Sequence, residues 1–361
     1  MKNLTPRTAL ALSLIAHAAA AQKGQSVSQS YTIEKIGRGL FAFIAPETFG
    51  SLVSGNSLVV IGDSAVLVVD AGHFPSLTRR MIAAIRSTTS KPVRYLVNTH
   101  WHPDHWLGNG DYRAAFPDVE IIATPFTRDE IRTQGPAYLK AYADSAAMTR
   151  QLSRVLGKDG SANAPAIDPA ARAYYEATIA DAAPAYAAWH SATLELPNVL
   201  VDKHLTVDLG NRTVEIMFLG RGNTSGDLAV FVPDERVLAT GDLVVSPTPY
   251  AFGSYFSEWT GVLDSLAAVK PSIIVPGHGI IQHDTSYLMR LRSLISTVRD
   301  RAHEAVKAGK SFEDFRKGID LSRFEREFAG DDPRRRFLFV QGFTTPGLRR
   351  AYDEAAFQVE R

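Results

Sequence analysis

The stretch His100-Trp101-His102-Pro103-Asp104-His105 carries the strongest structural and chemical signal in this chain. It places three histidines and one aspartate within six positions, although the whole chain has only 10 histidines. A metal site needs several unprotonated nitrogen or oxygen donors that converge on one point. On a tight loop, His100 and His102 can point one way while Asp104 and His105 point another. The stretch therefore predicts a metal site, with donors for two neighbouring ions.

The residues before this stretch have the pattern of strands and a helix. Residues 56–61 and 65–70 are apolar runs on either side of the turn Gly62-Asp63-Ser64, which predicts a β-hairpin. A helix is expected over 77–87 and a buried strand over 93–98. This strand leads directly into the histidine-rich stretch. Polar groups at strand ends are typical of sites in layered α/β folds.

A weak internal repeat of this pattern follows later in the chain. Residues 228–232 and 236–242 again flank a turn, and the strand expected over 273–275 leads into Pro276-Gly277-His278-Gly279. In each half, the second strand of the hairpin is expected to end in an aspartate, Asp70 or Asp242. The repeat predicts a core built from two similar halves.

The composition limits the possible partners and ligands. Lys plus Arg is 39 and Asp plus Glu is 38, so no long-range field would attract nucleic acid or an anionic membrane. The chain has no cysteine, which excludes disulfides and thiolate ligands. A metal would have to be held by histidine, carboxylate or amide groups. The expected partner is a small-molecule substrate, and the oligomeric state stays open.

The stretch 100–105 matches the H-x-H-x-D-H signature, and the chain therefore resembles the metallo-β-lactamase superfamily. Asp70, Gly241-Asp242 and Pro276-Gly277-His278-Gly279 follow in the family's order. The resemblance covers roughly residues 32 to 285. It implies an α/β layered fold, the αββα sandwich, in which two β-sheets flanked by helices carry a metal site at one edge.

The resemblance also divides the chain into regions. We expect one metallo-β-lactamase-like domain over 31–285, with an alanine-rich helical insert at about 127–200. A C-terminal helical extension is expected over 286–361. The insert could close over the metal site as a lid.

The resemblance implies zinc as the cofactor, bound as one or two ions. The first ion would take His100, His102 and the histidine of a Gly-His-Thr turn. The second would take Asp104, His105 and His278, while Asp242 bridges both. Asp104 and Asp242 are thus the expected catalytic carboxylates. Asp70 is expected either to hydrogen-bond a ligating histidine or to be a simple turn residue.

The sequence departs from the family pattern at Asn223, which stands where the Gly-His-Thr turn has its histidine. An amide oxygen can ligate zinc, but it is neutral and weaker than an imidazole nitrogen. We therefore expect a weaker first site, with a mononuclear enzyme, a labile first metal or lost activity as the outcomes. His190 and His204 are expected at the surface or in structural roles, and His73 in a loop.

Aromatic residues near the ligands are the candidates for a substrate pocket. They are Trp101, Trp106, Tyr250, Phe252 and Trp259. The alternative is that these side chains only pack the insert onto the core. Lys203, Arg221 and Arg236 could bind an anionic group, although each also fits a solvated surface position.

The N-terminal residues 1–21 have the pattern of a secretory signal peptide. A charged start precedes a short apolar run and then small residues, and this run is too short for a permanent membrane anchor. We therefore expect a periplasmic or secreted protein.

Together these features predict an exported zinc-dependent hydrolase that uses metal-activated water on an ester, lactone, amide or lactam bond in a small molecule. A β-lactamase-like antibiotic hydrolase and a hydrolytic dehalogenase are alternatives, because a fold alone does not select the substrate. An alternative of another class is a non-catalytic metal- or ligand-binding protein with a degenerated site.

Overall fold

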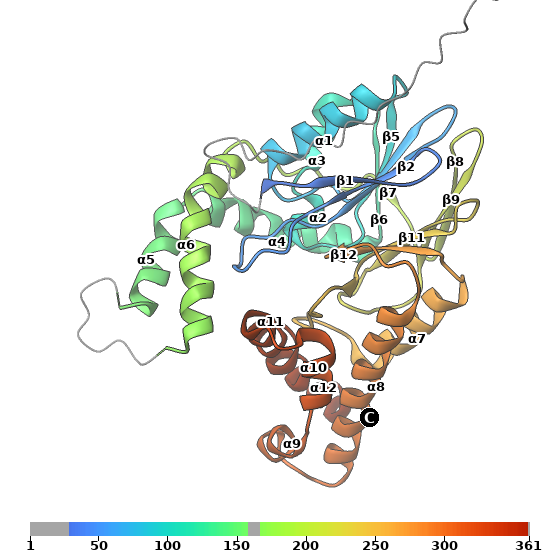
Figure 1. Cartoon of the computed structure of the whole chain (residues 1–361). Helices are drawn as coiled ribbons and strands as arrows, with labels where there is room; N and C mark the ends of the chain where they lie inside the picture. Colours follow the sequence, from blue (N-terminus) through green and yellow to red (C-terminus); the bar gives the residue numbers. More distant parts are fainter. Residues whose placement is uncertain (1–28, 158–166, 360–361) are drawn as a thin grey trace, which may run out of the picture.

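A computed structural model describes residues 29–157 and 167–359. Within these ranges two β-sheets pack face to face, and helices cover their outer faces (Figure 1). The αββα sandwich expected from the sequence is therefore confirmed. The expected signal peptide over 1–21 lies outside the described residues.

The first sheet has seven strands in the order of the chain. They are β1 (Thr32–Gly37), β2 (Leu40–Ile44), β3 (Ser57–Ile61), β4 (Val66–Val69), β5 (Val93–Val97), β6 (Glu120–Ala123) and β7 (Val199–Leu200). The pairs from β1 to β4 are antiparallel, and those from β4 to β7 are parallel. The predicted hairpin is β3–β4, in which Leu58 lies opposite Val69.

The second sheet has five strands in the order β12-β11-β10-β9-β8. They are β8 (His204–Asp208), β9 (Thr213–Phe218), β10 (Leu228–Val232), β11 (Val237–Val245) and β12 (Ile273–His278). The β10–β11 pair is antiparallel and β12 joins β11 in parallel, just as β5 joins β4. The predicted repeat is thus visible in the strand pairing of both halves.

Strand alternation explains how the layers hold together. In β4, Val66 and Val68 face the outer helices, whereas Leu67 and Val69 face the other sheet. All four side chains are buried. Because both faces of the strand are covered, the apolar run is continuous rather than alternating with polar residues.

The helices fall into three groups. The first group covers the sandwich: α1 (Pro75–Thr88), α2 (Pro103–Trp106), α3 (Asn109–Ala115) and α7 (Phe256–Ala268). The insert has α4 (Pro125–Tyr142), α5 (Ser145–Val155) and α6 (Pro169–Trp189). The C-terminal extension has α8 (Ser286–Lys307), α9 (Phe312–Gly318), α10 (Ser322–Ala329), α11 (Pro333–Leu338), a short π-helical segment (Phe339–Thr344) and α12 (Thr345–Val359). None of the described helices is both long enough and apolar enough to cross a membrane.

Two helical groups project away from the sandwich, with α5 and α6 in one and the C-terminal helices in the other (Figure 1). They meet where Phe337 of α11 packs against Tyr174 of α6 and against Phe49. Arg335 of α11 also forms an ion pair with Glu47. The extension is thereby attached to the edge of the sandwich and to the insert.

The structure corrects one expectation about the second hairpin. Its second strand does not end at Asp242, because β11 continues through it to Val245. The register with β12 shifts at Gly241, whose φ of +49° lies in the left-handed region. Glycine adopts this conformation at little cost, so the chain turns Asp242 out of the ladder without ending the strand.

Candidate metal centre

The histidine-rich stretch changes from extended to helical backbone between His102 and Pro103. His102 is the N-cap of the short helix α2, and Pro103 occupies its first turn, where the missing N–H has no intrahelical partner. This change brings the rings of His100 and His105 to 4.2 Å from each other, although five positions separate them in sequence.

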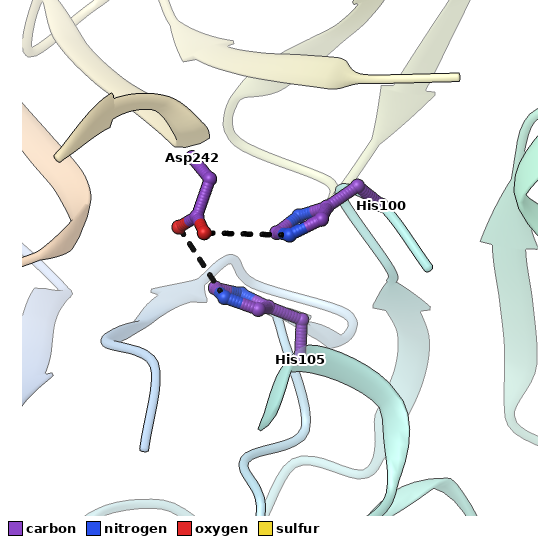
Figure 2. A group of neighbouring side chains, drawn as sticks. All are labelled: His100, His105 and Asp242. Atoms are coloured by element: carbon purple, nitrogen blue, oxygen red, sulfur yellow. Dashed lines mark ion pairs between the residues drawn. The ribbon is translucent and has the colours of Figure 1, made fainter. Parts of the chain in front are cut away.

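Asp242 lies between these two histidines (Figure 2). Its Oδ2 is 3.5 Å from Nε2 of His100, and its Oδ1 is 3.4 Å from Nε2 of His105. His278, from the end of β12, places its Nε2 3.5 Å from Oδ1 of the same carboxylate. A Cβ atom on Gly277 would lie 2.0 Å from Asp242 Oδ1, so only glycine fits at that position.

Two groups of donor atoms are close enough to hold a cation each. The first is His100, His105 and Asp242, and the second is Asp104, His105 and His278. The second group is the set that the resemblance implied. His102 lies beside the first group, since its Nδ1 is 3.0 Å from His100 Nε2 and 3.9 Å from Asp242 Oδ2.

Buried atoms without hydrogen-bond partners show that these residues fit a cation. Among the described residues, neither Nε2 of His105 nor Oδ1 of Asp242 has such a partner, although both are buried. Orphaned buried polar atoms are rare in folded proteins. The donors are histidine nitrogens and carboxylate oxygens, which are the ligand types that zinc takes where thiolate is absent.

The charges of the centre also favour a cation. Burial raises the pKa of Asp104 and of Asp242, but the imidazoles of His105 and His278 outweigh it and hold both pKa values well below the usual one. Burial and repulsion from His105 lower the pKa of His100 to about 4, against the attraction of Asp242. At neutral pH the centre therefore offers two ionised carboxylates and a neutral His100.

Asp70 fixes the orientation of two of the histidines from behind. Its Oδ2 lies 2.8 Å from Nδ1 of His105 and also accepts a hydrogen bond of 2.8 Å from the hydroxyl of Thr99. That hydroxyl has a single proton, so its contact of 3.0 Å with Nδ1 of His100 makes the ring nitrogen the donor. In the neutral form of either imidazole, the ring proton therefore lies on Nδ1 and Nε2 faces the centre. Of the two roles expected for Asp70, the structure therefore supports that of a hydrogen-bond partner of a ligating histidine.

Asn223 lies in a buried turn with no hydrogen-bond partner, among the described residues, for either polar atom of its side-chain amide. Asp227 holds this turn by accepting hydrogen bonds from the backbone N–H groups of Gly222 and Thr224 and from the Thr224 hydroxyl. Burial raises the pKa of Asp227 to about 6. Asn223 and His102 line the same pocket, which has a volume of about 460 Å³.

The aromatic candidates divide between pocket and core. Trp101 and Phe252 line the pocket of His102, and Tyr250 lines a smaller cavity of about 30 Å³ beside His278. The expectation that Trp106 and Trp259 line the pocket is wrong, because both side chains are fully buried in the apolar core. Their indole N–H groups donate to backbone carbonyls, so the polar atom of each ring is satisfied inside the protein.

His73, His190, His204 and the three candidate cations belong to neither donor group. His190 and His204 are exposed, and His204 pairs with Glu215. His73 lies in the loop between β4 and α1, as expected, and its side chain is buried there. Its Nδ1 contacts the Val53 carbonyl at 2.5 Å, and its ring packs on Trp189 of the insert. Among the candidate anion-binding side chains, Lys203 is exposed, Arg221 pairs with Glu258, and Arg236 donates to the carbonyl of Lys270.

Several residues at the site had no individual signal in the sequence. A Cβ atom on Gly55 would lie 2.6 Å from Cε1 of His105, so this glycine gives the imidazole its space. Glu130 and Tyr138 of α4 line the pocket of His102. Thr99 directly precedes His100 in the sequence. This position could have suggested that its hydroxyl hydrogen-bonds the imidazole.

Comparison with known proteins gives a family match over most of the sandwich. The model of the metallo-beta-lactamase superfamily matches residues 50–278. The chain is similar to a linear primary-alkylsulfatase of a Pseudomonas species, with 24% identity over 59% of this chain and 39% of that protein. It is also similar to the metallo-beta-lactamase type 2 of Bacillus cereus, with 24% identity over 64% of this chain and 69% of that protein.

Solved structures support the fold. A metallo-beta-lactamase from Pontibacter korlensis has a TM-score of 0.51 at 19% identity and covers 74% of this chain and 99% of its own. The stereoselective inverting sec-alkylsulfatase Pisa1 from a Pseudomonas species has a TM-score of 0.61 at 16% identity. That match covers 90% of this chain and 50% of the sulfatase.

Proposed function

Because the chain belongs to the metallo-β-lactamase superfamily, we propose that it is an exported, zinc-dependent hydrolase acting on an ester bond of a small molecule. The observation that carries this proposal is that two donor groups share His105 and lie next to His102, which lines a pocket. Lactone, amide and lactam bonds are the other substrates of the same chemistry.

The proposed mechanism assigns a task to each side chain. Asp104, His105 and His278 would hold one zinc ion, while His100, His102 and Asp242 would hold the other. Zinc bound there would supply a nucleophile at neutral pH, since it lowers the pKa of water from 15.7 to about 7. Asp70 and Thr99 direct the proton of the neutral His105 and His100 rings to Nδ1, so that Nε2 is the nitrogen that would bind zinc.

Asn223 has two possible tasks in this proposal. Its Oδ1 could complete the donor set of His100 and His102, as a neutral and weaker ligand than imidazole. Its Nδ2 could instead donate to an oxygen of the substrate that gains charge during the reaction. Both tasks need a buried side-chain amide that makes no hydrogen bond within the protein. Among the described residues, neither Oδ1 nor Nδ2 of Asn223 has a hydrogen-bond partner.

The breadth of the structural likeness favours a sulfate ester over a β-lactam as the second, more specific candidate. The sulfatase likeness extends over 90% of this chain, against 74% for the β-lactamase. A β-lactamase-like hydrolase and a hydrolytic dehalogenase remain as alternatives in the test.

The test combines metal analysis with a substrate panel. The purified protein, loaded with zinc, is assayed with p-nitrophenyl acetate, a secondary alkyl sulfate, a lactone, a chromogenic β-lactam and a haloalkane. We expect one or two bound zinc ions per chain and turnover of an ester. Tightly bound zinc without turnover of any panel member would support the non-catalytic binding protein instead.

Export is part of the proposal and rests on the charged start, apolar run and small residues within positions 1–21. Expression in a Gram-negative host followed by fractionation tests it. We expect the protein in the periplasm or medium with a new N-terminus near residue 22, whereas an intact Met1 in the cytoplasmic fraction would reject it.

A further inference from the structure

The pocket that contains His102 and Asn223 has walls of aromatic side chains. Four rings line it: Trp101, Tyr138, Phe252 and Tyr255. They come from the histidine-rich stretch, from α4 of the insert and from the loop that follows β11. Phe252 is 58% exposed, so its ring is largely free to contact a ligand. With about 460 Å³ the pocket has room for a small organic group next to the metal centre.

Glu130 of α4 is the acidic residue among the side chains that line this pocket. Of the described residues that line it, none is a lysine or an arginine. The Glu130 carboxylate forms no ion pair with a described residue, whereas nearby Arg132 on the same helix pairs with Asp129. Glu130 thus places in the pocket a carboxylate that no described residue pairs with.

Two guanidinium groups lie near the pocket, and both have their own carboxylates. Arg221 and Arg350 stack on the ring of Tyr255. Arg221 is bonded to Glu258 and Arg350 to Glu354. Their charges are therefore balanced locally. Their stacking also shows that an aromatic face at this rim accepts a cation.

We propose that this pocket selects substrates that carry an organic cation, a quaternary or protonated amine, in the part of the molecule remote from the bond that is cleaved. This inference rests on the proposed function, because it names the substrate class of the same site. Aromatic faces attract ammonium groups through the negative charge of their π-systems, and Glu130 adds a full opposite charge. An anionic group in this part of the substrate would be repelled by the Glu130 carboxylate, and no lysine or arginine in the pocket lining would offset that repulsion.

A neutral alkyl chain is the competing occupant, because it also fits aromatic walls. The two are separated by comparing choline with 3,3-dimethylbutan-1-ol, which have the same shape and differ in the charged nitrogen. Binding to the zinc-loaded protein is followed by tryptophan fluorescence, and Trp101→Phe identifies the part of the signal that comes from the pocket.

We expect choline to bind about fivefold more tightly than its neutral analogue, and we expect this preference to disappear in Glu130→Gln. Glu34→Gln is the matched control, because Glu34 is exposed on β1, far from the pocket in the sequence and the sheet. Equal binding of the two alcohols, or an unchanged preference in Glu130→Gln, overturns the proposal.

A second measurement uses turnover. The acetate esters of the two alcohols are compared by kcat/KM, and the choline ester should be preferred by a similar factor that Glu130→Gln removes. Hydrolysis without this preference would reject the cation pocket and leave the proposed function intact. Failure to hydrolyse any ester would reject the function, while the binding experiment still decides the pocket.

Discussion

The two sides of the metal centre differ in how firmly the protein holds them. On the His105 side, Asp70 holds the ring from behind, Gly55 gives it space, and His278 and Asp104 complete a set of three strong donors. On the His102 side, the ring is partly exposed, and the pocket beside it contains the neutral, unpartnered amide of Asn223. From this comparison we expect a tightly held metal on the His105 side and an exchangeable one on the His102 side.

Removal of the shared carboxylate should have the largest effect, because Asp242 contacts the donors of both sides. We expect Asp242→Asn to lower kcat/KM by roughly three orders of magnitude or more, since both donor groups lose their common charge. Metal content by mass spectrometry and turnover are measured together. Asp118→Asn, at an exposed position, is the control. A variant that keeps both its zinc and its turnover would remove Asp242 from the centre.

The next largest effect is expected from removing the hydrogen-bond partner of His105, which is Asp70. Asp70→Asn leaves the shape intact but removes the charge that holds Nδ1 of His105. Loss of such a partner typically lowers metal affinity by about 10- to 100-fold. Titration with a zinc-buffering chelator should show weakening of the tighter ion. If the weaker ion alone responds, then the assignment of the tight site to His105 is wrong.

A smaller effect is expected from filling the space beside His105. In Gly55→Ala the new methyl group would lie 2.6 Å from Cε1 of the ring, so the imidazole must shift. We expect the affinity of the tighter zinc ion to fall by about tenfold, as for moderate overpacking. Gly253→Ala is the matched control, because a Cβ atom there meets no atom within 4 Å. Equal zinc affinities in the two variants would show that the ring is free to move.

The smallest effect should come from strengthening the weak side. Asn223→His restores the imidazole of the family pattern, and we expect zinc stoichiometry to rise toward two, with a gain of several-fold in the affinity of the weaker ion, on the His102 side. Isothermal titration with zinc measures both quantities. Unchanged stoichiometry would show that Asn223 does not belong to the donor set of His100 and His102.

Sequence patterns predicted the layered fold and the repeat of its two halves because apolar periodicity is a local property. The same reasoning found Asp70 and Asp242 by their places at the second strand of each hairpin. It placed Trp106 and Trp259 at the pocket because adjacency to a ligand does not tell on which side of a helix or strand a ring lies. Sequence patterns also missed the bulge at Gly241 that lets β11 continue past its aspartate.

The sequence by itself determined which donors the chain carries, that they are imidazoles, carboxylates and one amide, and that thiolates are absent. These are properties of residue types and short spacings, and they survive any change in packing. The tertiary structure alone decided which atoms meet: Gly55 against His105, Gly277 against Asp242, and Glu130 in the same pocket as His102. The physical reason is that such contacts arise only when distant segments pack, since packing depends on the whole core rather than on neighbouring residues.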